Sequence, residues 1–116
     1  MKFYDDERIE YGKTKITTDM GVMDFDLMNI SGYGTMQFGA GATGFSEKDS
    51  GDDARASIQI KDLGMSDIRI KDLTKYTDYC RGNIIITMAG DAEVKSLIDG
   101  LRWMADTLES KITKSE

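Results

Sequence analysis

Two aspartates in the segment MDFDL are the first residues whose spacing could do chemistry. In a β-strand, Asp24 and Asp26 would project from the same side, roughly 7 Å apart. Such a pair could hold a divalent cation or act as acid and base. The same pattern fits the polar side of a strand whose apolar side carries Met23, Phe25 and Leu27. We favour the structural interpretation and keep Asp24 and Asp26 as weak candidates for a metal site.

A second group of carboxylates lies in the segment SEKDSGDD. Hard cations such as Ca²⁺ bind several oxygens of this kind, but the spacing is not that of an EF-hand loop. We therefore expect a solvated acidic loop without a metal. Its carboxylates are candidates for contacting a partner protein: Glu47, Asp49, Asp52 and Asp53.

The chain lacks the residues that most often complete an active site. There is no histidine, so the usual general base near neutral pH and the commonest zinc ligand are missing. The single cysteine, Cys80, stands beside Arg81, which could favour a reactive thiolate; its neighbours Leu73 and Tyr76 favour burial instead. We predict no catalytic residue and no cofactor.

The segment GAGATG, residues 39–44, fits the pattern G-x-G-x-x-G. A dinucleotide site requires this pattern between a strand and a helix of a parallel βαβ unit. The sequence that follows, FSEKDSGDD, is not an amphipathic helix. We therefore interpret residues 39–53 as a flexible loop rich in glycine and aspartate.

The charge of the chain is negative and uneven. The chain has 21 acidic and 15 basic residues, a net charge of −6. Residues 1–53 carry eleven acidic against five basic residues, and residues 54–116 carry ten of each, so the first half holds the whole net charge. Binding to nucleic acid requires clustered positive charge. We expect no direct nucleic-acid contact and a partner protein with a basic surface.

Length and composition predict a single domain, residues 1–116. No apolar segment approaches the ~20 residues of a membrane span, and the start MKFYDDERIE has no apolar signal region. One cysteine cannot form an internal disulfide. We therefore expect a cytoplasmic protein that does not contact a membrane.

The string I-x-I-K-D-L occurs twice, in SIQIKDLGMS and DIRIKDLTKY. Antiparallel pairing around Gly64 would place Ile58 opposite Ile70 and Ile60 opposite Ile68, with all four isoleucines on one side. The repeat therefore predicts a β-hairpin whose isoleucines are buried under a helix.

Further elements follow from periodicity. Alternation predicts strands near residues 15–18, 23–27 and 33–38. The spacing of apolar residues from Asp72 to Arg81 predicts a short helix with Asp72 as its N-cap. The apolar run Asn83–Met88 predicts a strand covered on both faces.

The clearest element is a C-terminal helix that begins at Asp91. Its apolar residues recur at the helical spacing and define one stripe, here named the apolar stripe. The stripe consists of Val94, Leu97, Ile98, Leu101, Met104, Ala105, Leu108 and Ile112. We expect an α+β fold in which this helix packs on one face of an antiparallel sheet of about five to six strands.

The only tryptophan, Trp103, lies about 180° from Val94 on this helix, among polar neighbours that include Asp99 and Asp106. A monomer would therefore expose it. Tryptophan often carries binding energy at interfaces, so we expect Trp103, Asp99 and Asp106 to contact a partner or to form a homodimer. The alternative is that a loop or the N-terminal segment covers Trp103.

These features favour a non-catalytic acidic interaction module. It would act as an adaptor or inhibitor that binds another macromolecule, as phage and mobile-element inhibitors bind host-defence or nucleic-acid-binding proteins, a similarity of type only. One alternative is a structural or assembly subunit of a phage-type particle. Another is a carboxylate-metal-dependent enzyme built on Asp24, Asp26 and the acidic loop.

Overall fold

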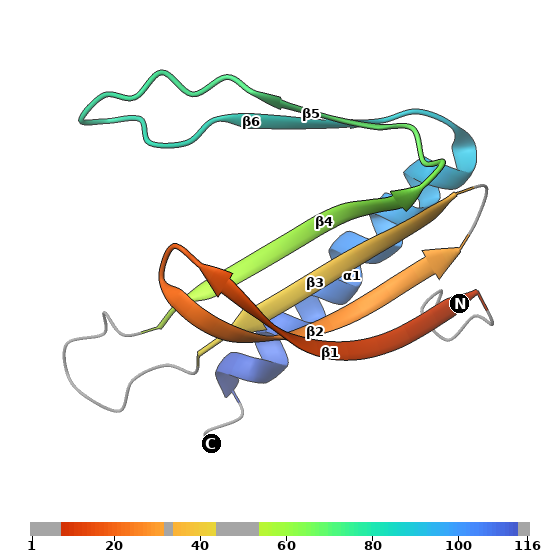
Figure 1. Cartoon of the computed structure of the whole chain (residues 1–116), viewed down its shortest axis with the longest axis horizontal. Coiled ribbons are helices and arrows are strands. Elements are labelled where there is room, and N and C mark those ends of the chain that lie inside the picture. Colours follow the sequence, from red (N-terminus) through yellow and green to blue (C-terminus); the bar gives the residue numbers. More distant parts are fainter. Residues whose placement is uncertain (1–7, 32–33, 44–53, 114–116) are drawn as a thin grey trace.

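A computed structural model describes residues 8–31, 34–43 and 54–113. It confirms the α+β class, with antiparallel strands followed by one long C-terminal helix (Figure 1). Within the described residues, no helix is long and apolar enough to cross a membrane. The elements are β1 (Ile9–Thr18), β2 (Gly21–Ser31), β3 (Thr35–Ala42), β4 (Ala56–Gly64), β5 (Ile68–Asp72), β6 (Ile84–Met88) and α1 (Asp91–Thr113).

Strands β1 to β4 form an antiparallel sheet in chain order. The β1–β2 turn closes because the Thr18 hydroxyl donates to the Gly21 carbonyl at 2.8 Å and accepts from the Met20 N–H at 3.0 Å. Gly21 has a φ of +100°, a conformation that side chains rarely adopt. The glycine after Met20 therefore lets the two long strands pair directly from the turn, with Thr18 opposite Gly21.

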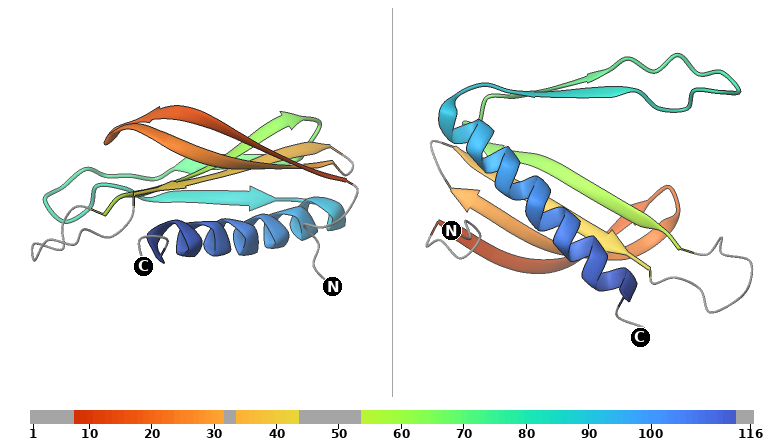
Figure 2. Two further views of the ribbon diagram at one scale, coloured as in Figure 1. Left: turned by 90° about the horizontal axis from the view of Figure 1, so that it is seen from below. Right: turned by 180° about the vertical axis from the view of Figure 1, so that it is seen from behind.

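The predicted hairpin between the two repeats is wrong. Strand β4 pairs with β3, so that Ile58 lies opposite Ala40, whereas β5 pairs with β6 in a separate sheet. At the end of β4, Asp62 accepts the N–H of Gly64 at 2.8 Å, and Met65, which follows the strand, has a φ of 64°. This turn sends the chain away from β4, and the β5–β6 hairpin diverges from the sheet (Figures 1 and 2).

The short helix predicted near residues 72–81 does not form. The Leu73 N–H donates to the Asn83 carbonyl at 2.7 Å, which extends the β5–β6 ladder by one bond. Thr77 closes the loop beyond it, because its hydroxyl accepts from the Cys80 N–H at 3.0 Å. These local side-chain bonds satisfy the backbone and compete with a helix.

The segment expected to begin a flexible loop at Gly39 continues as strand β3 through Ala42. A Cβ on Gly41 would lie 2.8 Å from Cδ1 of Phe25, and one on Gly39 would lie 3.1 Å from Cδ2 of the same ring. The two glycines therefore make room for the Phe25 ring, which is buried on the sheet face opposite α1. The rest of the predicted loop, residues 44–53, lies outside the described residues.

Helix α1 crosses the other face of the sheet diagonally, mainly beneath β3 (Figure 2). The sheet contributes large side chains to the core, and three of them are completely buried or nearly so: Met28, Met36 and Phe38. The full buried cluster is Met28, Ile30, Met36, Phe38, Ala40, Trp103 and Met104. Among the described residues, the helix contributes Trp103 and Met104 to this buried cluster, and Leu97 and Leu108 of the apolar stripe pack partly against it.

The helix is rotated relative to the orientation predicted from its apolar stripe. Trp103 is only 8% exposed, and Gly100, Ser96 and Thr107 are also buried. A Cβ on Gly100 would overlap the ring of Phe38. The side of the helix that packs on the sheet carries the small residues Ser96, Gly100 and Thr107 beside Trp103 and Met104. We name it the narrow side, because its small residues make room for the bulky side chains of the sheet. The predicted exposure of Trp103 is therefore wrong: its ring lies on the sheet side, with its centroid 6.5 Å from that of Tyr11.

Candidate functional site

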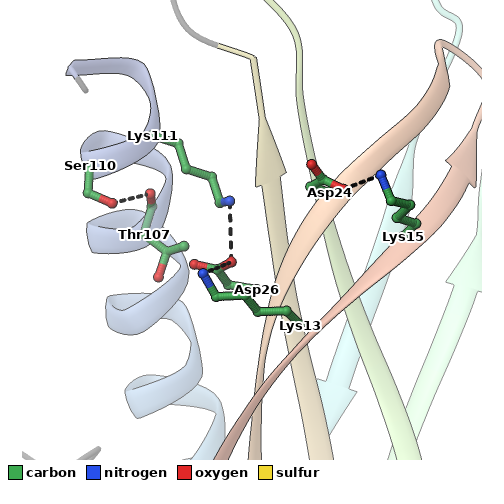
Figure 3. Close-up of polar contacts among 7 residues, drawn as sticks. All are labelled: Lys13, Lys15, Asp24, Asp26, Thr107, Ser110 and Lys111. Carbon is green, nitrogen blue, oxygen red and sulfur yellow. Dashed lines mark hydrogen bonds and ion pairs between the residues drawn. The ribbon is translucent and has the colours of Figure 1, made fainter. Parts of the chain in front are cut away.

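A charged groove of about 540 Å³ lies between the C-terminal end of α1 and strands β1 and β2. The register of β1 and β2 places Lys13 opposite Asp26 and Lys15 opposite Asp24. The Lys15 Nζ lies 3.1 Å from Asp24 Oδ1 (Figure 3). Asp26 Oδ1 lies 3.3 Å from the Nζ of Lys111 and 3.9 Å from that of Lys13. The two aspartates are thus each paired with lysine ammonium groups.

The last turns of α1 hold Lys111 over this groove. The Ser110 hydroxyl donates to the Thr107 carbonyl at 2.9 Å, one turn before the lysine (Figure 3). The Lys111 side chain is 19% exposed and that of Asp26 is 32% exposed. This partly buried pair ties the C-terminal part of the helix to β2, and partial burial makes it less screened than a surface pair.

The geometry argues against a metal site at Asp24 and Asp26. A cation would have to displace the ammonium groups that lie 3.1 Å and 3.3 Å from the two carboxylates. Divalent ions also need several oxygen ligands. Among the described residues, no group of three or more metal-ligating side chains comes together. The groove is best explained as a set of ion pairs that fixes α1 against the β1–β2 hairpin.

Asp72, predicted to cap a helix, instead accepts hydrogen bonds at the end of β5. The Thr74 N–H donates to Asp72 Oδ1 at 2.9 Å. Hydrogen bonds from the Thr74 side chain and then its backbone lower the pKa of the Asp72 carboxyl below its ordinary value, because they favour the charged form. This carboxylate therefore stabilises the hairpin loop.

The residues predicted to contact a partner do not form one surface. Trp103 and Asp99, which is 4% exposed, lie buried on the sheet side of α1, whereas Asp106 is exposed. Contact of these three residues with a partner remains a prediction. The four acidic loop residues lie outside the described residues: Glu47, Asp49, Asp52 and Asp53.

The rotation of α1 turns much of its apolar stripe outward. Val94 is 42%, Ile98 is 43% and Leu101 is 49% exposed. Ile58 projects from the helix-facing side of β4, opposite Ala40, and is 56% exposed. It is uncovered because α1 lies mainly under β3, to which β4 is the neighbour. We name the three exposed residues of α1, Val94, Ile98 and Leu101, the outer apolar surface.

The β5–β6 hairpin carries a further apolar ladder. Its register places Ile68 opposite Met88, Ile70 opposite Ile86, and Asp72 opposite Ile84. The first of these pairs packs against the core, but Ile70 and Ile84 remain exposed. The strand predicted to be covered on both faces is therefore largely uncovered.

Sequence reasoning missed the outer apolar surface because it assigned the whole apolar stripe to the sheet. One signal was present: small residues at Ser96, Gly100 and Thr107 share a second side of the helix. Small residues let a helix approach a surface that carries large side chains. The helix therefore had two sides able to pack, and the four-stranded sheet receives one of them.

Comparison with known proteins gives no relative from which a function could be transferred. No family model matches the chain, and neither a curated protein nor a solved structure shows significant similarity to it. Function must therefore be argued from the described surfaces alone.

Proposed function

We propose that this protein is a non-catalytic interaction module, an adaptor or inhibitor, that binds another protein chain through its outer apolar surface. The observation that supports this is the exposure of Leu101, Ile98 and Val94 on a helix whose other side is already packed. Side chains of this kind cost free energy when they face water, about 1.5–3 kcal/mol each if fully exposed rather than fully buried. A partner that covers them recovers part of that energy.

The surface has the composition of an interface centre. Contiguous apolar patches on monomeric proteins are commonly functional, and here Val94, Ile98 and Leu101 follow one another along one side of α1. The edge of the surface carries charge, with Lys95 and Arg102 exposed on α1. An apolar centre with a polar edge is typical of protein–protein interfaces.

An enzyme is the less favoured function. The two carboxylates with suitable spacing, Asp24 and Asp26, are paired with lysines. The lowered pKa of Asp72 is explained by its own turn, because Thr74 donates hydrogen bonds to this carboxylate. Neither arrangement combines a nucleophile with a base and a binding cleft.

An assembly subunit of a phage-type particle is a second candidate. Strands β1 and β4 are edge strands of the four-stranded sheet, and the β5–β6 hairpin diverges from it (Figure 1). Edge strands and projecting hairpins with exposed apolar residues can pair with further chains. Assembly would then involve more than one surface, and sedimentation at rising concentration would show species larger than a dimer.

Partner capture with matched variants tests the interaction module. We expect a partner retained by the wild type to be lost by Leu101→Glu and kept by Met20→Glu. Met20 is 68% exposed at the β1–β2 turn, so this control adds the same charge away from the surface. A captured protein must then bind again from purified components.

Salt dependence tests the predicted basic partner, because attraction between an acidic chain and a basic surface weakens as ionic strength rises. If Leu101→Glu retains every association of the wild type, the proposed function is refuted.

A further inference from the structure

We propose that the outer apolar surface is covered by a second copy of this chain, with the two α1 helices side by side and antiparallel. This inference rests on the proposed function and names the partner of the same surface. It makes the protein a symmetric dimer built on a helix pair.

The spacing of the apolar stripe supports a helix as the occupant. Six of its residues follow one another at alternating steps of four and three: Val94, Ile98, Leu101, Ala105, Leu108 and Ile112. This is a heptad pattern over nearly three repeats, which places all six along one seam when helices pack side by side. Val94, Ile98, Leu101 and Ala105 are exposed, whereas Ile112 is half-buried and Leu108 also packs partly against the core. A surface adapted only to a sheet needs no such register.

The two ends of the seam also match each other. In an antiparallel pair with its two-fold axis near residue 103, Val94 faces Ile112 of the second copy. Ile98 then faces Leu108, and Leu101 faces Ala105, so every apolar residue of the seam meets another one. A two-fold axis requires a self-complementary surface of this kind.

Charged residues beside the seam fit the antiparallel direction. Lys95 and Glu109 lie on the same edge of the seam, near its opposite ends. The two-fold axis brings Lys95 of one copy near Glu109 of the other, twice. Arg102 lies near the axis, close to Arg102 of the second copy. Its long side chain can turn to solvent there. In a parallel pair, the two-fold axis would place these edges on opposite sides of the seam, and Lys95 would lie fourteen residues along the helix from Glu109 of the second copy, so the two could not pair.

Sedimentation and light scattering of the full chain test the second copy. We expect twice the 12.9-kDa chain mass at high concentration, and dissociation on dilution. Leu101→Glu should raise the dissociation constant at least about 100-fold, because each dimer would bury two unpaired carboxylates. Met20→Glu should leave it unchanged.

Cross-linking tests the direction of the helices. In a Cys80→Ser background, Arg102→Cys should be joined by a short bis-maleimide reagent, since both copies lie near the axis. Lys95→Cys should not be joined. Residue 95 lies eight residues from the axis in each copy, so the two cysteines are about 24 Å apart along the helices. A parallel pair would join both variants equally, and that result would overturn the antiparallel arrangement.

The outcomes separate the two proposals. A chain that stays monomeric at every concentration, while Leu101→Glu still loses a captured partner, overturns the second copy and leaves the proposed function standing. If Leu101→Glu behaves like the wild type in both experiments, both proposals are overturned.

Discussion

Gly100→Ala measures which side of α1 packs on the sheet. Glycine costs about 1 kcal/mol relative to alanine inside a helix, so the substitution would stabilise the protein by that amount if Gly100 faced solvent. Instead, the added Cβ would lie 2.5 Å from Cδ1 and Cζ of Phe38, a side chain with no exposed surface. The gain in helix propensity would stabilise the protein, whereas the overlap with Phe38 would destabilise it.

Overpacking of a core costs about 1–3 kcal/mol, and an overlap with several ring carbons belongs in the upper half of that range. After the gain in helix propensity, we expect Gly100→Ala to destabilise the protein by about 1–2 kcal/mol. In a domain of this size, that corresponds to a melting temperature lower by about 4–8 °C.

Urea denaturation and calorimetry measure the effect, with Gly12→Ala as the matched control. Gly12 lies in β1 with nothing within 4 Å of an added Cβ, so we expect no loss and a gain of up to about 1 kcal/mol. If Gly100→Ala instead stabilised the protein by about 1 kcal/mol, Gly100 would face water and the rotation of α1 would be refuted.

Three other substitutions test the packing of the helix, its ion pair and the hairpin loop. Trp103→Ala should cost about 3–5 kcal/mol of unfolding free energy, as for a buried aromatic residue, whereas a loss below about 1 kcal/mol would mean that the side chain is exposed. Asp26→Asn should cost about 1 kcal/mol, since it leaves the partly buried Lys111 ammonium unpaired, and the cost should shrink in 1 M salt; a cost independent of salt would contradict this. Thr74→Val should raise the pKa of Asp72 toward its ordinary value in an NMR titration. Because the pKa of Asp72 is lowered in the folded chain, its stabilising effect is present above the unfolded pKa and is lost as the pH falls through the folded pKa. An unchanged Asp72 titration would contradict the role of the Thr74 hydroxyl.

Local patterns predicted the elements that depend on local physics. The alternation around Phe25 gave strand β2, and the periodicity after Asp91 gave helix α1. The lysine partners of Asp24 and Asp26 could also have been predicted from the sequence. A turn at Thr18–Gly21 places Lys13 opposite Asp26 and Lys15 opposite Asp24 by counting alone.

Strand pairing over long range was not predictable from the repeat. The symmetric pattern of Ile58, Ile60, Ile68 and Ile70 fits a hairpin, yet β4 pairs with β3 instead. Pairing with β3 brings Ile60 against the large, buried side chain of Phe38. Local sequence cannot compare that gain with the hairpin, because the competing strand lies far away in the chain.

The orientation of α1 was not predictable for a related reason. A helix with one apolar side has one way to pack, but α1 has an apolar side and a side of small residues around Gly100. The side that faces the sheet depends on the sheet, whose Phe38, Met28 and Met36 require a narrow neighbour. The orientation of α1 also determines which of its residues form the outer apolar surface. Because the predicted orientation was wrong, sequence reasoning did not find this candidate site.

The most direct test of the account is acrylamide quenching of Trp103 in the Leu101→Glu variant. The variant should be folded and monomeric, and the chain has a single tryptophan, so the signal reports one side chain. If the narrow side of α1 packs on the sheet, Trp103 remains shielded by the core without any second copy. The account predicts a blue-shifted emission and slow quenching. An unfolded variant, or a folded one with readily quenched tryptophan, would mean that Leu101 belongs to the core and would contradict the account.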